Sequence, residues 1–350
     1  MTIPASAPPP PRRVLLIKPS ALGDVVTAMP VLRGLRRTFP EAHLAWLVAT
    51  PFAPLIAHDG DLDEVILFDR RRLGRAWRSP AAGRALGDLL RGLRAGRFDW
   101  AIDLQGLLRS ALFAAATRAR VRAGFADARE CAATFYTHRI AAVAAHTVDR
   151  NIELARAMGI DARPSDMTLQ VAPAASEFAE RLLRREGLRR GGFLACVPPT
   201  RWKTKQYPER YWRKVVADLA GRTRVVLLGA AGDRALCERI AASGPSGVVN
   251  LAGQTGVGEM AAVIAAAAGV VCCDSAAKFI ANAVGTGVVV LVGPTRLERT
   301  GPYPAGTALL ADVPCQGCLQ RRCRHVTCMQ SIRPSEVVCE ATKMLVGQEA

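Results

Sequence analysis

The sequence predicts an α/β protein with two doubly wound halves, each built on a parallel sheet. Short apolar runs alternate with segments of helical periodicity along the chain, which is typical of strand–helix–strand units. Connecting helices of this kind favour parallel strands covered on both faces. The alternation restarts after a boundary near 172–190, and 350 residues, half of them apolar, suffice for two domains.

The first half begins with a strand at 13–18 (RVLLIK) and a turn that contains Pro19, Ser20 and Gly23. A helical segment at 24–38 follows, and Pro30 is expected to kink or restart it because proline lacks an amide hydrogen. The other expected elements are strands at 43–49, 64–68, 100–106 and 121–125, a basic segment at 82–96 and a helix at 149–159.

The second half follows a loop at 160–174 and a linking helix at 175–188. Its clearest helix, at 209–221, places Trp212, Val215, Val216 and Leu219 on one face. The remaining expected elements are strands at 192–199, 223–230, 247–253, 270–274 and 287–294, and helices at 232–243, 260–269 and 277–285. We therefore predict a leader at 1–11, an N-terminal domain at 12–174 and a C-terminal domain at 175–350, whose last helix can pack back on the N-terminal domain.

The net charge of +17 indicates an anionic partner, such as nucleic acid, an acidic membrane surface or a phosphorylated substrate. The alternative is that the positive charge only reflects an Ala/Arg/Gly-rich composition. Aromatic residues make up only 5% and zinc-finger spacing is absent, so nucleic acid is disfavoured. No apolar run reaches the roughly 18 residues of a transmembrane helix. The proline-rich opening lacks the apolar core of a signal peptide, which favours a disordered leader and a cytoplasmic protein.

Open parallel sheets bind ligands beyond the carboxyl ends of their strands, so two such domains are expected to face a shared cleft there. Asp24 follows the first strand at a glycine-containing turn, where a carboxylate can accept a proton from an attacking hydroxyl. Helix capping is the alternative role of Asp24. The arginines within 69–78 can clamp a phosphorylated acceptor, or they can simply form a solvated loop.

In the second half, the segment 198–208 (PPTRWKTKQYP) follows a strand, and its residues 200–205 combine three cations with two hydroxyls. Such a set suits a diphosphate held without a metal, and a solvated basic loop is the alternative. Asp233 follows another strand, where a carboxylate can accept a hydrogen bond from a ribose. The glycine pattern of dinucleotide-binding folds and the Walker A sequence are both missing, which disfavours dehydrogenases and P-loop NTPases.

The segment 272–279 (CCDSAAKF) places Asp274 and Ser275 where a strand turns into a helix. The free amides and dipole of the first helical turn can bind a phosphate, and Lys278 adds a positive charge nearby. Plain N-capping by Ser275 is the alternative.

Four cysteines near the C-terminus have the spacing C-x2-C-x4-C-x4-C, with His325 among them. This spacing can hold zinc or an iron–sulfur cluster, although it lacks the paired form with a long loop. Disulfides are unfavourable in a reducing cytosol, and the other six cysteines fit mainly in apolar cores. The four residues concerned are Cys315, Cys318, Cys323 and Cys328.

Taken together, these motifs resemble the lipopolysaccharide heptosyltransferases, which are glycosyltransferases of the GT-B fold. The resemblance covers nearly all of 12–345. It implies two Rossmann-like domains facing a central cleft, and transfer of heptose from ADP-heptose to the inner core of lipopolysaccharide. It further implies inversion at the anomeric centre, no required cofactor or metal, and peripheral contact with the cytoplasmic face of the inner membrane. The segments that carry it are KPSALGDVVTAMPVLRGLRRTFP, DLQGLLRSAL, TRWKTKQYP, DSAAKFIANAVGTGVVVLVGPT and CQGCLQRRC…CMQSIRPSEV.

The resemblance also assigns roles. Asp24 takes the position of the general base, and Lys205 that of the lysine at the donor phosphates. The implied donor-binding residues are Thr200, Arg201, Asp233, Asp274, Ser275, Ala276 and Lys278. The implied acceptor-binding residues are Arg70, Arg71, Arg72, Arg75, Arg129 and Gln105.

The chain departs from the family at the phosphate helix, where the usual pattern is Asp-Ser/Thr-Gly-x-x-His. Here Ala276 replaces the glycine and Phe279 the histidine. Three rivals therefore stay open. They are a related transferase with another nucleotide sugar or acceptor, a non-catalytic nucleotide- or lipopolysaccharide-binding protein, and a nucleic-acid-binding protein that the charge alone suggests.

Overall fold

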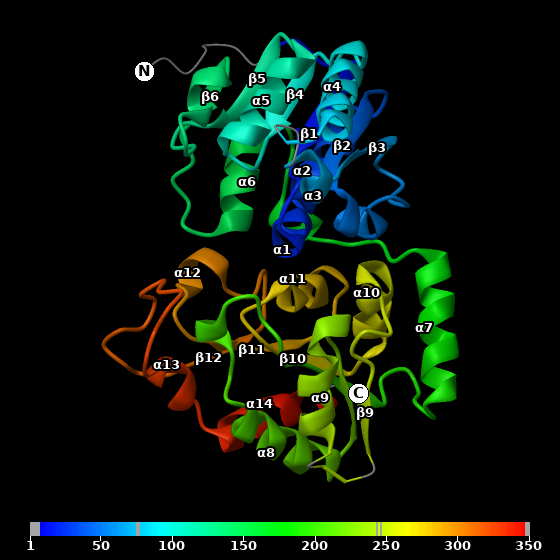
Figure 1. The fold of residues 1–350 in the computed structure, drawn as a ribbon, viewed down its shortest axis with the longest axis vertical. Coiled ribbons are helices and arrows are strands. Elements are labelled where there is room, and N and C mark those ends of the chain that lie inside the picture. The colour runs from blue at the N-terminus through cyan, green and yellow to red at the C-terminus, as the bar shows by residue number, and fades with distance from the viewer. Residues whose placement is uncertain (1–7, 75–77, 243, 246, 347–350) are drawn as a thin grey trace. The chain divides into compact units, whose positions relative to one another are not determined.

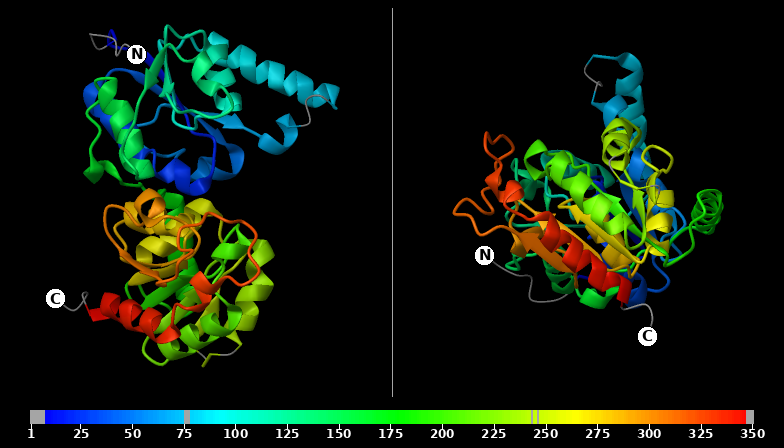
Figure 2. Two further views of the ribbon diagram at one scale, coloured as in Figure 1. Left: turned by 90° about the vertical axis from the view of Figure 1, so that its left-hand side faces the viewer. Right: turned by 90° about the horizontal axis from the view of Figure 1, so that it is seen from below.

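The computed structural model describes residues 8–74, 78–242, 244–245 and 247–346. The chain divides into two compact units, Met1–Met167 and Thr168–Ala350. Each unit contains one six-stranded parallel sheet with helices around it (Figure 1 and Figure 2). The predicted α/β fold with two doubly wound sheets is therefore confirmed.

The sheet of the first unit has the strand order β3-β2-β1-β4-β5-β6. Its central strand β1 pairs with β2 and β4, so that Val14 lies between Leu44 and Trp100. Side chains of Leu15 and Ile17 are fully buried in the core on one face, and neighbouring residues of the strand alternate to the other face. The strands are β1 (Arg13–Ile17), β2 (His43–Ala49), β3 (Glu64–Phe68), β4 (Trp100–Asp103), β5 (Val121–Phe125) and β6 (His138–Ile140).

The helices of the first unit include the expected restart at Pro30, which lies in the first turn of α2. In α2, Gly34 allows close approach, because a Cβ there would lie 2.9 Å from the backbone of Ala162. The helix α4 packs beside α5, and α6 packs against α2. The bounds are α1 (Leu22–Val26), α2 (Met29–Thr38), α3 (Arg70–Leu73), α4 (Pro80–Ala95), α5 (Leu108–Thr117) and α6 (Thr147–Ala157), with short 3-10 turns η1 (Thr50–Leu55), η2 (Ala132–Phe135) and η3 (Pro164–Asp166).

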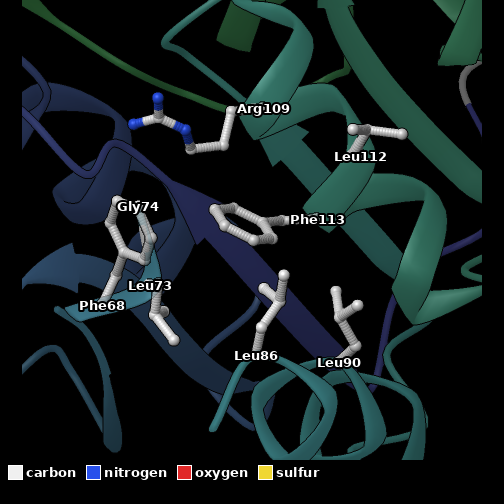
Figure 3. Close-up of a pocket in the computed structure, with 8 residues that line it drawn as sticks. All are labelled: Phe68, Leu73, Gly74, Leu86, Leu90, Arg109, Leu112 and Phe113. Carbon is white, nitrogen blue, oxygen red and sulfur yellow. The ribbon is translucent and has the colours of Figure 1, made fainter. Parts of the chain in front are cut away.

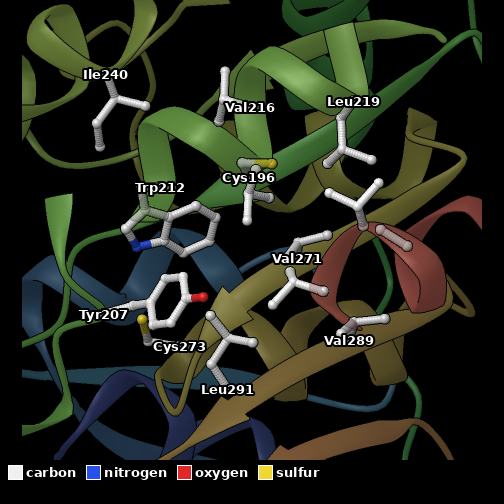
Figure 4. Packing of buried hydrophobic residues seen from close by; sticks show 14 of the residues in the cluster. Cys196, Tyr207, Trp212, Val216, Leu219, Ile240, Val271, Cys273, Val289 and Leu291 are labelled. Atoms are coloured by element: carbon white, nitrogen blue, oxygen red, sulfur yellow. The ribbon is translucent and has the colours of Figure 1, made fainter. Parts of the chain in front are cut away.

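The sheet of the second unit has the order β12-β11-β10-β7-β8-β9. Its core contains the predicted apolar face of α8, with Trp212 packed edge-on to the ring of Tyr207 (Figure 4). The strands are β7 (Phe193–Val197), β8 (Arg224–Leu227), β9 (Val248–Asn250), β10 (Gly269–Cys273), β11 (Val288–Val292) and β12 (Thr307–Leu310).

The helices of the second unit cover both faces of this sheet. The last helix, α14, packs on α8, β10 and β11 of its own unit. The helices are α7 (Pro173–Arg185), α8 (Glu209–Ala220), α9 (Arg234–Ala241), α10 (Val257–Ala266), α11 (Ala276–Ala283), α12 (Leu297–Thr300), α13 (Thr327–Gln330) and α14 (Pro334–Val346), with 3-10 turns η4 (Lys203–Lys205) and η5 (Ala231–Asp233). None of the helices in the described residues is long and apolar enough to cross a membrane.

Candidate active site

Asp24 lies in the first turn of α1, directly after the turn that ends β1. Its Oδ2 accepts a hydrogen bond from the backbone N–H of Ala21 at 2.8 Å, so the carboxylate does cap the helix. This contact uses one of the two carboxylate oxygens. The side chain is half-buried, which leaves part of it accessible to a ligand.

Gln105 reaches the same turn from the loop after β4. Its Oε1 accepts from the N–H of Ser20 at 3.3 Å, while Asp24 holds the next residue, Ala21. The structure thus brings Asp24 and Gln105 together. Arg129 joins this group through its backbone, because its N–H donates to Gly106 O at 3.0 Å, and its side chain is exposed.

Lys18 directly follows β1 and is only 5% exposed. Its Nζ donates to Leu104 O at 2.5 Å. Burial lowers the pKa of Lys18, and the nearby carboxylates of Asp24 and Asp103 oppose that shift. A buried ammonium therefore lies within electrostatic reach of the proposed base.

Asp103 is fully buried and fixes the loop that carries Gln105. Its Oδ1 accepts from the N–H of Gln105 at 2.8 Å and of Gly106 at 3.2 Å, and its Oδ2 accepts from the hydroxyl of Tyr136 at 2.6 Å. Burial raises the pKa of Asp103, although these hydrogen bonds oppose the rise. Burial, together with the contact to the Asp103 carboxylate, raises the pKa of Tyr136.

The arginines expected to clamp an acceptor lie on α3 at the carboxyl end of β3. Asp69 caps this short helix, since its Oδ1 accepts from the N–H of Arg71 and of Arg72, both at 3.0 Å. The side chains of Arg70, Arg71 and Arg72 are exposed, and no carboxylate of the described chain pairs with them. The segment is thus a helical turn rather than a loop, and Arg75 lies outside the described residues.

In the second unit, Lys205, Asp274 and Lys278 form a charged cluster. Lys205 Nζ donates to Asp274 Oδ2 at 2.7 Å, and Lys278 Nζ donates to Asp274 Oδ1. Thr295 Oγ1 donates to Asp274 Oδ2 at 2.6 Å. Burial alone would raise the pKa of Asp274, but the ammonium groups of Lys278 and Lys205 outweigh it and lower that pKa to about 2.

The two lysines of this cluster differ in accessibility. The side chain of Lys278 is 2% exposed and that of Lys205 is 16% exposed. Lys278 therefore lies behind Asp274, and Lys205 is the ammonium that a ligand can reach. Burial lowers the pKa of Lys278, against the opposing charge of Asp274.

Ser275 and Ala276 form the start of α11 beside this cluster. Ser275 precedes the helix but makes no side-chain cap, and its buried Oγ has no hydrogen-bond partner among the described residues. A buried hydroxyl without a partner is unusual, and it lies at a helix N-terminus that favours anions.

The segment after β7 is held by contacts with the loop that contains the four cysteines. Thr204 Oγ1 donates to Gln320 O at 2.9 Å. The ammonium of Lys205 and the guanidinium of Arg321 lie over the ring of Trp202, at 4.6 and 4.5 Å from its centre. Thr200 Oγ1 donates to Trp202 O at 2.7 Å, which shapes the turn into η4.

Two other predicted donor-binding residues, Arg201 and Asp233, make no contact with the Lys205 cluster among those described above. Arg201 is exposed. Asp233 uses Oδ2 to accept from the N–H of Ala230 at 2.9 Å, so this carboxylate caps the turn η5. None of these contacts joins Asp233 to the Lys205 cluster.

Comparison with known proteins decides the family. The model of glycosyltransferase family 9 (heptosyltransferase) matches residues 86–328. The chain belongs to glycosyltransferase family 9. The lipopolysaccharide heptosyltransferase 1 of Pseudomonas aeruginosa is 29% identical to it, over 96% of this chain and 99% of that protein. The enzyme of the same name from Salmonella typhimurium is 28% identical, over 83% and 91%.

Solved structures show the same fold. A family 9 glycosyltransferase from Veillonella parvula superimposes with a TM-score of 0.84 at 19% identity, covering 96% of this chain and 98% of the other. The Escherichia coli heptosyltransferase WaaC with ADP-2-deoxy-2-fluoro heptose gives 0.73 at 25% identity, covering 97% and 100%. The predicted GT-B architecture and the predicted resemblance to the lipopolysaccharide heptosyltransferases are both confirmed.

The four cysteines of the C-terminal motif do not converge in the described residues. Within the ranges that the structure covers, no three His, Cys, Asp or Glu side chains are arranged to hold an ion. Cys328 is buried, whereas Cys318 and Cys323 are exposed. The backbone of this segment instead supports the turn at Thr204.

Sequence reasoning missed Lys18, Tyr136 and Thr295. A lysine that ends an otherwise apolar strand was a usable signal for Lys18, and Thr295 follows a strand end as the other polar candidates do. Nothing in the sequence pairs Tyr136 with Asp103, because the two residues lie 33 positions apart.

Proposed function

We propose that this protein transfers heptose from ADP-heptose to the inner core of lipopolysaccharide, with inversion and without a metal or other cofactor. The observation that carries the proposal is the nearly end-to-end match to the lipopolysaccharide heptosyltransferase 1 of P. aeruginosa. The similar structure of WaaC with ADP-2-deoxy-2-fluoro heptose supports an ADP-sugar as donor.

Asp24 is the proposed base. It takes the proton of an acceptor hydroxyl while that oxygen forms a bond to the anomeric carbon of the donor. The bond from that carbon to the diphosphate oxygen breaks, and ADP leaves with the electron pair. Attack from the side opposite ADP inverts the configuration. Asp24 belongs to the first unit and Lys205 to the second.

Lys205 is proposed to stabilise the charge that develops on departing ADP. It is the more exposed ammonium of its cluster, and Arg201 and Lys203 precede it on the same segment. The unpartnered hydroxyl of Ser275 and the first amides of α11 provide further donors for the diphosphate. Side chains and amides can thus take the role that a metal ion has in other transferases.

The acceptor of such a reaction is anchored in lipid, so we place the protein at the cytoplasmic face of the inner membrane, bound peripherally. The net charge of +17 supports this location, because anionic lipids attract a basic surface. The exposed arginines Arg70, Arg71 and Arg72, with Arg129 near Gln105, are the proposed contacts to acceptor phosphates.

A second function is kept because one observation favours it. Ala276 and Phe279 replace the family's glycine and histidine, and Lys278 is buried against Asp274. These changes lie at the diphosphate helix, so they support a related transferase with a different nucleotide sugar or acceptor. A non-catalytic binding protein would share the altered helix, but it has no use for Asp24.

ADP release tests the proposal. Purified protein is given ADP-heptose and heptose-free lipopolysaccharide core in the presence of EDTA, beside Asp24→Asn and the control Asp88→Asn, an exposed carboxylate of the same unit. Asparagine keeps a carbonyl oxygen for the N–H of Ala21 but cannot act as a base. We expect acceptor-dependent release that Asp24→Asn reduces by about 100-fold or more and the control retains.

Each other outcome of the ADP-release assay contradicts a different part of the proposal. Release that EDTA abolishes would contradict metal independence, and a product with retained anomeric configuration by NMR would contradict inversion. Release from another nucleotide sugar but not from ADP-heptose would identify the related transferase. Full activity of Asp24→Asn would exclude Asp24 as the base.

A further inference from the structure

The first unit has an apolar hollow at the carboxyl end of β3. Its cavity volume is about 170 Å³, and it lies among α3, α4 and α5 (Figure 3). This volume is below the roughly 300–1,000 Å³ of pockets that enclose a whole drug-sized ligand, so the hollow suits a short stretch of an apolar chain. The lining residues are Phe68, Leu73, Gly74, Leu86, Leu90, Arg109, Leu112 and Phe113.

Aromatic rings and leucines form the walls. Phe68 and Phe113 are buried and pack edge to face with ring centres 5.2 Å apart. Leu86 and Leu90 are half-buried on α4, while Leu112 is 45% exposed on α5. Apolar walls that remain accessible to water are stabilised when an apolar ligand covers them.

Among the described residues that line the hollow, Arg109 is the one with a charged side chain. Its guanidinium lies 5.8 Å from the ring centre of Phe68, and Figure 3 shows it across the hollow from Leu86 and Leu90. A polar metabolite would need several directed polar partners in its pocket. One cation beside an apolar hollow instead fits a long apolar chain with an anionic head.

The surrounding surface has the charge that such a head requires. The segments 69–74, 78–95 and 108–117 hold eight arginines and two aspartates. The aspartates are Asp69, which caps α3, and Asp88, which pairs with Arg91. The arginines are Arg70, Arg71, Arg72, Arg78, Arg84, Arg91, Arg94 and Arg109.

We propose that this hollow binds part of one acyl chain of an anionic phospholipid of the bilayer, with the phosphate held by Arg109 and the arginines of α4. Leu67 and Leu108, which are 52% and 38% exposed, extend the apolar surface outside the hollow. The inference rests on the proposed function for the membrane location and specifies the contact. The apolar walls leave water when the chain covers them, and the arginines supply the second, electrostatic contribution that a stable peripheral anchor needs.

Vesicle flotation tests the anchor without any need for catalysis. Vesicles of phosphatidylethanolamine and phosphatidylglycerol in a 3:1 ratio are mixed with the protein, with Leu112→Glu, or with the control Leu310→Glu. Leu310 has a similar exposure, 43%, but belongs to the second unit. We expect Leu112→Glu to lower the bound fraction at least tenfold and Leu310→Glu to leave it unchanged. Equal flotation of the two variants would overturn the proposal.

A phospholipid with a diazirine in its acyl chain provides a second measurement on the unmodified protein. We expect crosslinks to residues of the hollow, such as Leu86 and Leu90, and crosslinks confined to other surfaces would contradict the assignment. Vesicles of phosphatidylcholine alone are expected to bind at least tenfold less protein. Equal binding to them would refute the role of the arginines.

A turnover measurement distinguishes the two possible sources of the acyl chain in the hollow, which are a bilayer lipid and the acceptor itself. The ratio of turnover on vesicle-embedded acceptor to turnover on deacylated soluble acceptor is expected to fall at least tenfold in Leu112→Glu and to stay unchanged in Leu310→Glu. Normal flotation of Leu112→Glu, combined with lost turnover on acylated acceptor in micelles, would assign the hollow to the acceptor and overturn our choice. Failure of the proposed transferase would leave flotation unaffected, so the two proposals fail separately.

Discussion

Asp274→Asn is the substitution with the largest predicted effect on the second unit. Asp274 is 5% exposed and is the counter-ion of Lys278 and Lys205. Asparagine has the same shape but no charge. The variant therefore leaves the ammonium of Lys278 buried without a carboxylate, while the hydrogen bond from Thr295 can still be made.

The size of the effect follows from the pKa of Asp274. A decrease from 3.8 to about 2 corresponds to about 2 kcal/mol of stabilisation of the folded state. Desolvation of the orphaned Lys278 adds to this loss, and removal of one partner from a buried pair typically costs about 3–5 kcal/mol. We expect a decrease of that size in the free energy of unfolding at pH 7.

The stabilisation that Asp274 provides depends on pH in a defined direction. The pKa of Asp274 is depressed in the folded state, so its stabilisation is complete above pH 3.8 and is lost as pH falls through about 2. The difference between wild type and Asp274→Asn should therefore narrow below pH 3.8. Toward alkaline pH the variant should regain stability, because the buried Lys278 can release its proton.

Urea denaturation followed by circular dichroism measures these values, with Asp218→Asn as the control. Asp218 is exposed on α8 of the same unit, and its substitution should change the unfolding free energy by less than about 0.5 kcal/mol. The double variant Asp274→Asn/Lys278→Met should recover much of the loss, since it removes the orphaned charge. A loss below about 1 kcal/mol, or one that does not change between pH 7 and pH 2.5, would refute this reasoning.

Two further substitutions test buried contacts of the first unit. Tyr136→Phe removes the hydroxyl that donates to Asp103 and should lower the unfolding free energy by about 1–3 kcal/mol. The loss should be larger at pH 7 than at pH 4, because the donor stabilises the ionised carboxylate, and equal losses in urea titrations at the two pH values would contradict this. Arg33→Ala breaks a two-pronged pair with the buried Asp59, with distances of 2.5 and 2.7 Å, and should cost about 3–5 kcal/mol in thermal unfolding. In Arg33→Lys the loss should be only partial, and a loss equal to that of alanine would argue against a surviving ion pair.

The pattern of apolar residues was sufficient to predict most of the strands. The strands at 43–49, 64–68 and 121–125 have the predicted bounds, because their apolar runs end at polar or turn residues. Two edge strands were missed, β6 and β12. The strand β6 (HRI) has one apolar residue in three, and β12 is four residues long and follows a proline- and glycine-rich turn, so neither was recognised as an apolar run.

Two helices of the first unit were missed for different reasons. The helix α5, LRSALFAAAT, has small apolar residues on several faces, so its sequence shows only a weak helical period. The helix α3 is one turn of arginines, and charge alone suggested a loop. Its cap by Asp69 was visible as an aspartate before a short polar run, but that signal is common in turns as well.

The candidate site was partly predictable because strand ends mark it. This rule found Asp24, Lys205 and Asp274, whose catalytic and binding roles stay predictions. How deeply each of these side chains is buried was not predictable from the sequence. The spacing of Asp274 and Lys278 allows a contact one helical turn apart, but only the packing of α11 on β10 and β11 buries that contact.

This burial determines which charge is left for a ligand. The cluster has two ammonium groups and one carboxylate, and the pKa of about 2 keeps Asp274 ionised at neutral pH. Lys278, at 2% exposure, compensates Asp274 from the protein interior. The excess positive charge therefore belongs to Lys205, which has the accessible position. If Lys278 were apolar, Asp274 would neutralise Lys205 and the surface would offer no net charge to a diphosphate. Lys278 can thus take the electrostatic part of a missing phosphate contact without touching the phosphate.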